Sequence, residues 1–226
     1  MTTRRVLLVL IGAAGLSVGL IATSQLGAWD REEAPAVRAT HSSLAGIPQR
    51  GTVLGNPDAP VTLVEYADLQ CPYCAEWAAR TFPVLVSDYV RTGKLRIVFH
   101  GLAFIGPDSD TALRTALVAG REGRLWNVVA GFYLLQGAEN AGWVTDDLVD
   151  DVAAEAGLDG DRLRNARDES WVSEELRNAQ ATADAAGVRG TPSFQLGRTG
   201  GALELVKLRS LGPEGITPAI DALLRP

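Results

Sequence analysis

The chain has only two cysteines, Cys71 and Cys74, which lie two residues apart in the segment DLQCPYCAEW. Such a pair can form a structural disulfide, contribute to a zinc site or exchange disulfides with another molecule. A structural disulfide stabilises a fold by closing a long loop, and this pair would close almost none. A structural zinc site needs four ligands, but the whole chain offers two cysteines and two histidines. Redox exchange is therefore favoured over the other two interpretations.

The position of the pair also favours redox chemistry. Pro60–Leu69, just before it, is rich in Val, Leu and Tyr, which predicts a buried strand. Beyond it, apolar residues recur at helical spacing: Ala78, Phe82, Leu85, Val86 and Tyr89. Cys71 would then lie at the amino end of a helix, where free N–H groups and the helix dipole stabilise a thiolate. Pro72 suits the first helical turn.

The elements predicted around this junction indicate an α/β protein with a mixed sheet. Pro83 is expected to kink the first helix. The later elements are a strand over Lys94–His100, a helical region over about 107–187 in which Thr145 caps a helix, a hairpin of Pro192–Gly197 and Ala202–Leu208, and a terminal helix over Pro213–Leu224. A strand–helix–strand unit predicts a parallel strand pair, and the hairpin adds antiparallel strands.

The amino-terminal residues 1–27 predict a membrane anchor or a cleaved signal peptide. Arg4 and Arg5 precede an uncharged run from Val6 to about Thr23, long enough at roughly 18 residues to span a bilayer. The arginines should stay in the cytoplasm, which places the remainder outside. Residues 28–51 are polar and interrupted by prolines, which predicts a linker to a domain over 52–226.

The composition is that of an ordinary globular protein. The net charge is −6, and 21% of residues are charged. A negative chain is repelled by phosphate backbones, so nucleic acid is not an expected partner.

The motif CPYC after a strand, with GTPS far downstream, resembles the thioredoxin-fold disulfide oxidoreductases of bacterial cell envelopes. The resemblance is strongest to the DsbA-like group and covers roughly Thr52 to Leu224. It implies a thioredoxin-like mixed central sheet with an inserted helical subdomain at about 107–187. No cofactor is expected, and the sequence has no dense carboxylate loop that would argue for a bound metal.

The resemblance assigns roles to the residues of the two motifs. Cys71 would be the exposed nucleophile, and the more buried Cys74 would resolve the mixed disulfide. Pro192 would be a cis-proline that faces the disulfide, and Thr191 would touch both the disulfide and the substrate.

Three further residues have expected roles with alternatives. Glu65 lies in an apolar strand, where a carboxylate is costly to bury; related proteins use an acid there to move the proton of the second cysteine, and an ion pair with Lys94 is the alternative. Tyr73 replaces the histidine that the strongest oxidants of the family often have. Tyr73 and Trp77 are predicted to join Pro72 in an apolar substrate surface, and simple packing against the insertion is the alternative for Trp77.

The expected function is that of an extracytoplasmic thiol:disulfide oxidoreductase. The Cys71–Cys74 disulfide would oxidise cysteine pairs of unfolded exported proteins, and a membrane partner, quinone-linked by analogy with the family, would reoxidise the enzyme. The alternatives are a reductase or isomerase of the same fold and a non-redox peptide-binding module.

Overall fold

The computed structural model describes residues 42–225. The predicted anchor or signal segment, residues 1–27, and residues 28–41 of the predicted linker lie outside this range. Within residues 42–225, no helix combines the length and the apolar character that crossing a bilayer requires.

From residue 61 onward, the described chain folds into strands and helices in the predicted order, and two short strands precede them. The strands are β1 (Gln49–Arg50), β2 (Val53–Leu54), β3 (Val61–Asp68), β4 (Leu95–Leu102), β5 (Ser193–Arg198) and β6 (Glu204–Val206). The helices are α2 (Pro72–Arg80), α3 (Phe82–Leu85), α4 (Pro107–Arg121), α5 (Leu125–Leu134), α6 (Asp146–Glu155), α7 (Gly160–Ala166), α8 (Ser170–Ala185) and α9 (Thr217–Leu224), with a π-helical turn η1 (Val86–Val90) and a 3-10 turn η2 (Pro213–Gly215).

The six strands form one mixed sheet in the order β1-β2-β4-β3-β5-β6. β3 pairs with β4 in parallel and with β5 in antiparallel orientation, so β3 is a central strand. All eight of its residues are buried, as the apolar pattern predicts. The prediction of a mixed α/β fold is confirmed.

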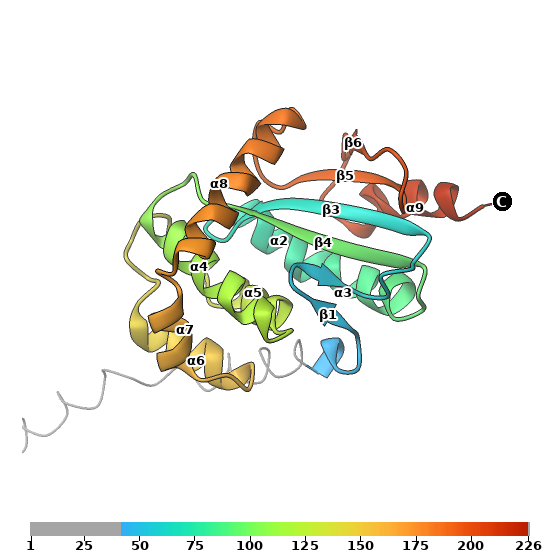
Figure 1. The fold of residues 1–226 in the computed structure, drawn as a ribbon. Coiled ribbons are helices and arrows are strands. Elements are labelled where there is room, and N and C mark those ends of the chain that lie inside the picture. Colours follow the sequence, from blue (N-terminus) through green and yellow to red (C-terminus); the bar gives the residue numbers. More distant parts are fainter. Residues whose placement is uncertain (1–41, 226) are drawn as a thin grey trace, which may run out of the picture.

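The helical insertion lies between β4 and β5 in sequence and gathers around one end of the sheet (Figure 1). It consists of α4 to α8, close to the predicted range of 107–187. Thr145 caps α6 as predicted, because its side chain accepts a hydrogen bond from Leu148 N.

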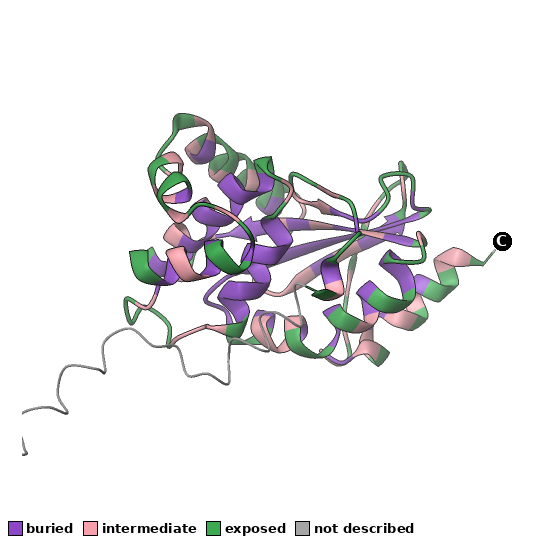
Figure 2. Cartoon of the chain, turned by 90° about the horizontal axis from the view of Figure 1, so that it is seen from below, coloured by how far each residue is buried: buried purple, intermediate pink, exposed green. Residues whose placement is uncertain are grey.

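The insertion and the sheet share one hydrophobic core. Figure 2 shows the buried residues along the sheet and the inward sides of the helices around it. Trp126 of α5 stacks on Phe82 of α3, with ring centroids 5.2 Å apart, and meets the edge of Phe99 of β4 at 5.7 Å. The insertion is therefore packed onto the first helix and the sheet.

The folded domain begins earlier than predicted, within the segment interpreted as a linker. Leu44 is buried in the core, and Gln49–Arg50 forms β1, which pairs with β2. A strand of two residues has no visible alternation, and therefore the sequence pattern did not reveal it.

The first helix is interrupted two residues before the proline expected to kink it. α2 ends at Arg80 and α3 begins at Phe82. Pro83 lacks a backbone N–H and its ring crowds the carbonyl four residues earlier, so the preceding turn opens. Thr81, at the interruption, donates its hydroxyl to Leu211 O at 2.5 Å.

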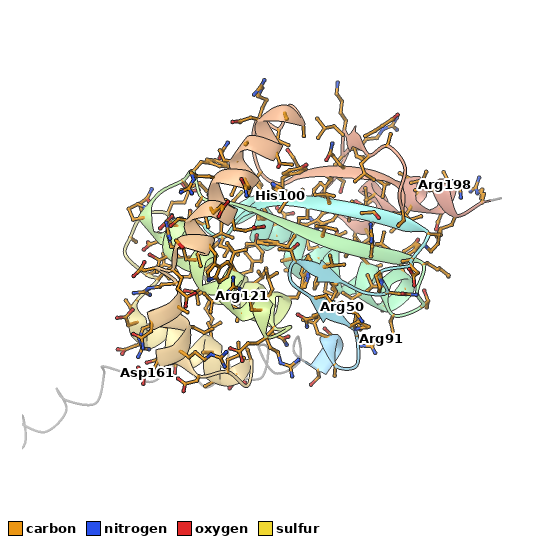
Figure 3. The ribbon with its side chains drawn as sticks, in the orientation of Figure 1. Arg50, Arg91, His100, Arg121, Asp161 and Arg198 are labelled. Carbon is orange, nitrogen blue, oxygen red and sulfur yellow. The ribbon has the colours of Figure 1, made fainter. Side chains whose placement is uncertain are left out.

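His100 has structural contacts on both sides of its ring. It lies on β4 beside α8 (Figure 3), where its Nε2 is 2.8 Å from the carbonyl oxygen of Ala179. Its ring also packs against Tyr66, with centroids 4.6 Å apart.

Candidate active site

Cys71 lies at the junction of β3 and α2, as the sequence predicts. Its backbone N–H donates to Asp68 O at 3.0 Å in the turn that follows β3. α2 begins at Pro72, so Cys71 is the N-cap residue. The Cys71 sulfur lies 3.3 Å from the carbonyl oxygen of Thr191, to which the thiol donates. The two motifs that carry the family resemblance therefore meet at this sulfur.

The surroundings of Cys71 favour its thiolate. The pKa of Cys71 is lowered to about 6, chiefly because the Cys74 thiol hydrogen-bonds to its sulfur. The side chain of Thr191 and the first-turn N–H groups of Tyr73 and Cys74 lower the pKa further, while burial opposes them. Cys71 is only 5% exposed, less than the exposed nucleophile that the resemblance implies, because its sulfur packs against the Thr191 backbone.

The pKa of Cys74 is shifted in the opposite direction to that of Cys71. It is fully buried, and burial together with the neighbouring Cys71 raises the pKa of its thiol well above 9.0. Both cysteines are thiols in this structure. The pair thus combines the easily ionised Cys71 sulfur, at the start of α2, with the buried Cys74 sulfur, which stays protonated.

Glu65 is a buried acid on the central strand. It is 2% exposed and pairs with Phe99 of β4 and Phe194 of β5. Burial raises the pKa of its carboxyl to about 8, and the neighbouring Trp77 indole partly opposes this. The alternative of an ion pair with Lys94 is wrong, since Lys94 precedes Leu95, whose partner in the sheet is Val61, four residues before Glu65.

The carboxyl of Glu65 lines a cavity of about 360 Å³ between α2 and α5. Most of the lining is apolar and includes Ala75, Ala78 and Val129. The Tyr133 side chain also lines it, and its buried hydroxyl has no hydrogen-bond partner among the described residues. Glu65 therefore lies beside a cavity and is not surrounded by packed side chains alone.

The predicted substrate-binding residues divide into two groups. The Thr191–Pro192 peptide bond is cis, as expected, and Tyr73 beside Pro72 is 61% exposed. Trp77 is 1% exposed, so its expected place in a substrate surface is wrong. It packs against Phe194 of β5, with ring centroids 4.2 Å apart, because its position in α2 faces the sheet.

The structure has a buried polar cluster next to the cysteines that the sequence did not predict. Asp68 is fully buried, and its carboxyl accepts four hydrogen bonds, from Gln70 N, Ser109 Oγ, Phe104 N and Ile105 N, at 2.5 to 3.2 Å. Gln70 is also buried and donates to Ser109 Oγ at 2.9 Å. Two polar residues at the end of an apolar strand were the available indication, but the partners distant in sequence lie in the β4–α4 loop and in α4.

Comparisons with known proteins agree with this geometry. A protein-family model described as "Thioredoxin" matches residues 49–201. A "Probable disulfide bond formation protein D" of Bacillus anthracis is 29% identical over 144 residues, which are 62% of this chain and 66% of that protein. The chain thus matches just under two thirds of this relative's length.

Solved structures share the fold. The crystal structure of oxidised BdbD from Bacillus subtilis has a TM-score of 0.68 at 21% identity and covers 79% of this chain and 97% of that chain. A thioredoxin-like oxidoreductase from Silicibacter pomeroyi DSS-3 has a TM-score of 0.59 at 26% identity, covering 86% of this chain and 97% of that one. With the family model matching residues 49–201, the chain therefore belongs to the thioredoxin family.

Proposed function

We propose that this protein donates the Cys71–Cys74 disulfide to cysteine pairs of unfolded exported proteins on the outer side of the membrane. The observation that carries the proposal is the Cys71 sulfur, held at the amino end of α2 and 3.3 Å from Thr191 O, with its pKa lowered to about 6. A stabilised thiolate is a good leaving group and makes the reduced pair favourable, so the disulfide is readily given away.

The exchange takes two steps. A client thiolate attacks the Cys71 sulfur of the disulfide, the Cys71–Cys74 bond breaks, and Cys74 leaves with the electron pair. A second client thiolate then attacks the client sulfur bound to Cys71, and Cys71 leaves as a thiolate. The client loses two electrons and gains a disulfide, and the enzyme becomes the dithiol.

Glu65 is the proposed proton donor to Cys74. The Cys74 thiolate formed in the first step is buried, and its raised pKa means that it takes up a proton. With a pKa of about 8, Glu65 carries a proton at neutral pH. The cavity beside Glu65 gives that proton a route of exchange with solvent.

Tyr73, Thr191 and Pro192 form the proposed client-binding surface, with Pro72 beside them. Tyr73 is the most exposed large apolar side chain among the described residues, at 61%. It follows the nucleophile by two residues, and the backbone carbonyl of Thr191 contacts the Cys71 sulfur. An extended, apolar client segment placed between them would bring its cysteine to Cys71.

Location and reoxidation belong to the same proposal. The sequence of residues 1–27 and the likeness to disulfide bond formation protein D support a place outside the cytoplasmic membrane. Disulfides persist in such compartments. The reduced enzyme then needs an electron acceptor, which we propose to be a membrane partner.

The reduction potential of the cysteine pair tests the direction of exchange. Thioredoxin, with a cysteine pKa of about 7, has a potential of about −270 mV, and DsbA, with about 3.5, reaches about −120 mV. Cys71, with a pKa of about 6, lies between them. At about 30 mV per pKa unit, we expect about −190 to −240 mV against a glutathione buffer series. A potential at or below about −270 mV would instead indicate a reductase.

Replacing Glu65 by Gln should slow disulfide donation about a hundredfold at pH 7, because general acid catalysis by this carboxyl is lost. As pH rises through about 8, Glu65 itself loses its proton. The ratio of wild-type to Glu65→Gln rates should therefore fall toward one above pH 8. Stopped-flow measurement of the oxidation of one reduced peptide over pH 5–9 gives this ratio. Because both proteins oxidise the same peptide, the pH dependence of the peptide's own ionisation affects both rates equally and does not change the ratio.

Two observations control this experiment. The exposed Glu204, on β6, should give a rate ratio near one at every pH when replaced by Gln. The oxidised wild type should also lose unfolding free energy as pH rises from about 4.5 through about 8, because folding raises the pKa of Glu65 and the native state then holds its proton more tightly. A ratio that does not change with pH would remove Glu65 from the proton transfer.

A further inference from the structure

The loop between α5 and α6, residues 135–145, binds the backbone of the segment that ends in the nucleophile. Gln136 Nε2 donates to Leu69 O at 2.8 Å and to Cys71 O at 3.2 Å. A single side-chain amide from the insertion therefore bridges the carbonyl groups on either side of Gln70.

The same loop also holds the residue between these two carbonyls. Asn140 N donates to Gln70 Oε1 at 2.6 Å, and Gln70 Nε2 reaches Asn140 Oδ1 at 3.3 Å. Asn140 Nδ2 in turn donates to Ile105 O at 3.0 Å. Each of the three consecutive residues 69–71 is thus hydrogen-bonded to the α5–α6 loop.

A hydrogen bond to the Cys71 carbonyl can affect the reactive sulfur of the same residue. It already accepts hydrogen bonds from Cys74 N and Ala75 N, both at 3.1 Å, which form the first turn of α2. The Gln136 amide adds a further donor to this oxygen. Because the oxygen carries partial negative charge in the same residue as the reactive sulfur, a donor directed at it reduces the repulsion that a thiolate meets.

We propose that Gln136 is a positioning residue for disulfide exchange, which holds the Leu69 and Cys71 carbonyls so that the nucleophile stays fixed between the first turn of α2 and Thr191. The insertion then serves the reacting sulfur directly, in addition to packing on the sheet. The inference rests on the proposed function only in taking Cys71 as the nucleophile.

Replacing Gln136 by Leu should make Cys71 harder to ionise. The leucine keeps most of the side-chain volume and removes the donor to the Leu69 and Cys71 carbonyls. We expect the pKa of Cys71 to rise by about 0.5–1 unit, a three- to tenfold loss of thiolate at a pH below the pKa. The reduction potential should fall by about 15–30 mV. The rate of iodoacetamide alkylation against pH, on the full-length reduced protein, measures the first quantity.

Replacing Gln136 by Lys separates positioning from a merely structural role. The ammonium group keeps N–H donors for both carbonyls and adds a positive charge beside them, so Cys71 should titrate below the wild-type pKa. A structural role would instead leave the Cys71 pKa unmoved in both variants, with effects on unfolding alone. Should Gln136→Leu fail to fold, a Cys71 pKa in Gln136→Lys at or above the wild-type value contradicts the proposal by itself.

Gln180 supplies the matched control. It is an exposed glutamine on α8 whose Nε2 contacts Asp184 at 3.1 Å, and Gln180→Leu should change neither the Cys71 pKa nor the potential. An unchanged Cys71 pKa in Gln136→Leu, or an equal shift in Gln180→Leu, overturns the role of Gln136. A wild-type Cys71 that titrates near 9 counts against the proposed function instead, so the two failures are distinguishable.

Discussion

Cys71→Ser is expected to abolish disulfide donation, with a loss of at least about three orders of magnitude in the rate of oxidation of a reduced peptide. A mixed disulfide requires a sulfur at residue 71, and serine cannot form one. Cys74 does not replace Cys71, because it is fully buried and burial keeps its thiol protonated. Release of free thiols from the peptide, followed with a thiol reagent, measures the rate.

Cys74→Ser is the matched comparison, since it leaves the nucleophile in place and removes the resolving sulfur. A Cys71 held in a mixed disulfide should then accumulate when the variant is offered an activated peptide disulfide, and reductant should release the peptide. If Cys71→Ser oxidises the peptide as fast as the wild type does, or the wild type transfers no disulfide, the enzymatic proposal fails. Peptide binding that survives with no transfer would favour the non-redox binding module.

Asp68→Ala is expected to lower the free energy of unfolding by about 3–5 kcal/mol. The carboxyl of Asp68 is fully buried and accepts four hydrogen bonds from β3–α2, β4–α4 and α4. Removing it leaves buried donors without acceptors, each of which costs about 1–3 kcal/mol before the structure relaxes. Urea unfolding of the oxidised protein, followed by circular dichroism, measures the change.

Two variants define this effect. Asp68→Asn keeps one acceptor oxygen and should lose about half as much. Asp58, an exposed residue shortly before β3, should change the stability by less than about 0.5 kcal/mol when replaced by Ala. Equal stabilities for Asp68→Ala and Asp58→Ala would show that the cluster around Asp68 does not stabilise the fold.

Predictions from the sequence succeeded where the information is local. A buried strand is readable over Pro60–Leu69 because apolar residues run through it, and all eight residues of β3 are indeed buried. A thiolate-stabilising helix end is readable from the CPYC motif, since the strand end, Pro72 and the first turn lie within a few residues. Thr145 and the cis bond at Pro192 were likewise expected, the first from its capping chemistry and the second from the family resemblance.

Predictions failed where the neighbours of a residue depend on how distant parts of the chain pack together. Trp77 suits an exposed or a buried site equally well in sequence, and only its contact with Phe194 of β5 shows that it faces the sheet. Glu65 and Lys94 are compatible with an ion pair until the register of β3 against β4 separates them.

By itself, therefore, the sequence of this protein determined which of its two sulfurs is the reactive one. Cys71 lies at the start of a helix, and Cys74 follows one helical turn later. Only the tertiary structure decided what surrounds that sulfur. Thr191 O and Gln136 Nε2 reach Cys71 from 120 and 65 residues away. Hydrogen bonds over such separations arise from the packing of the insertion and the β5 segment against α2, and no spacing in the sequence encodes them.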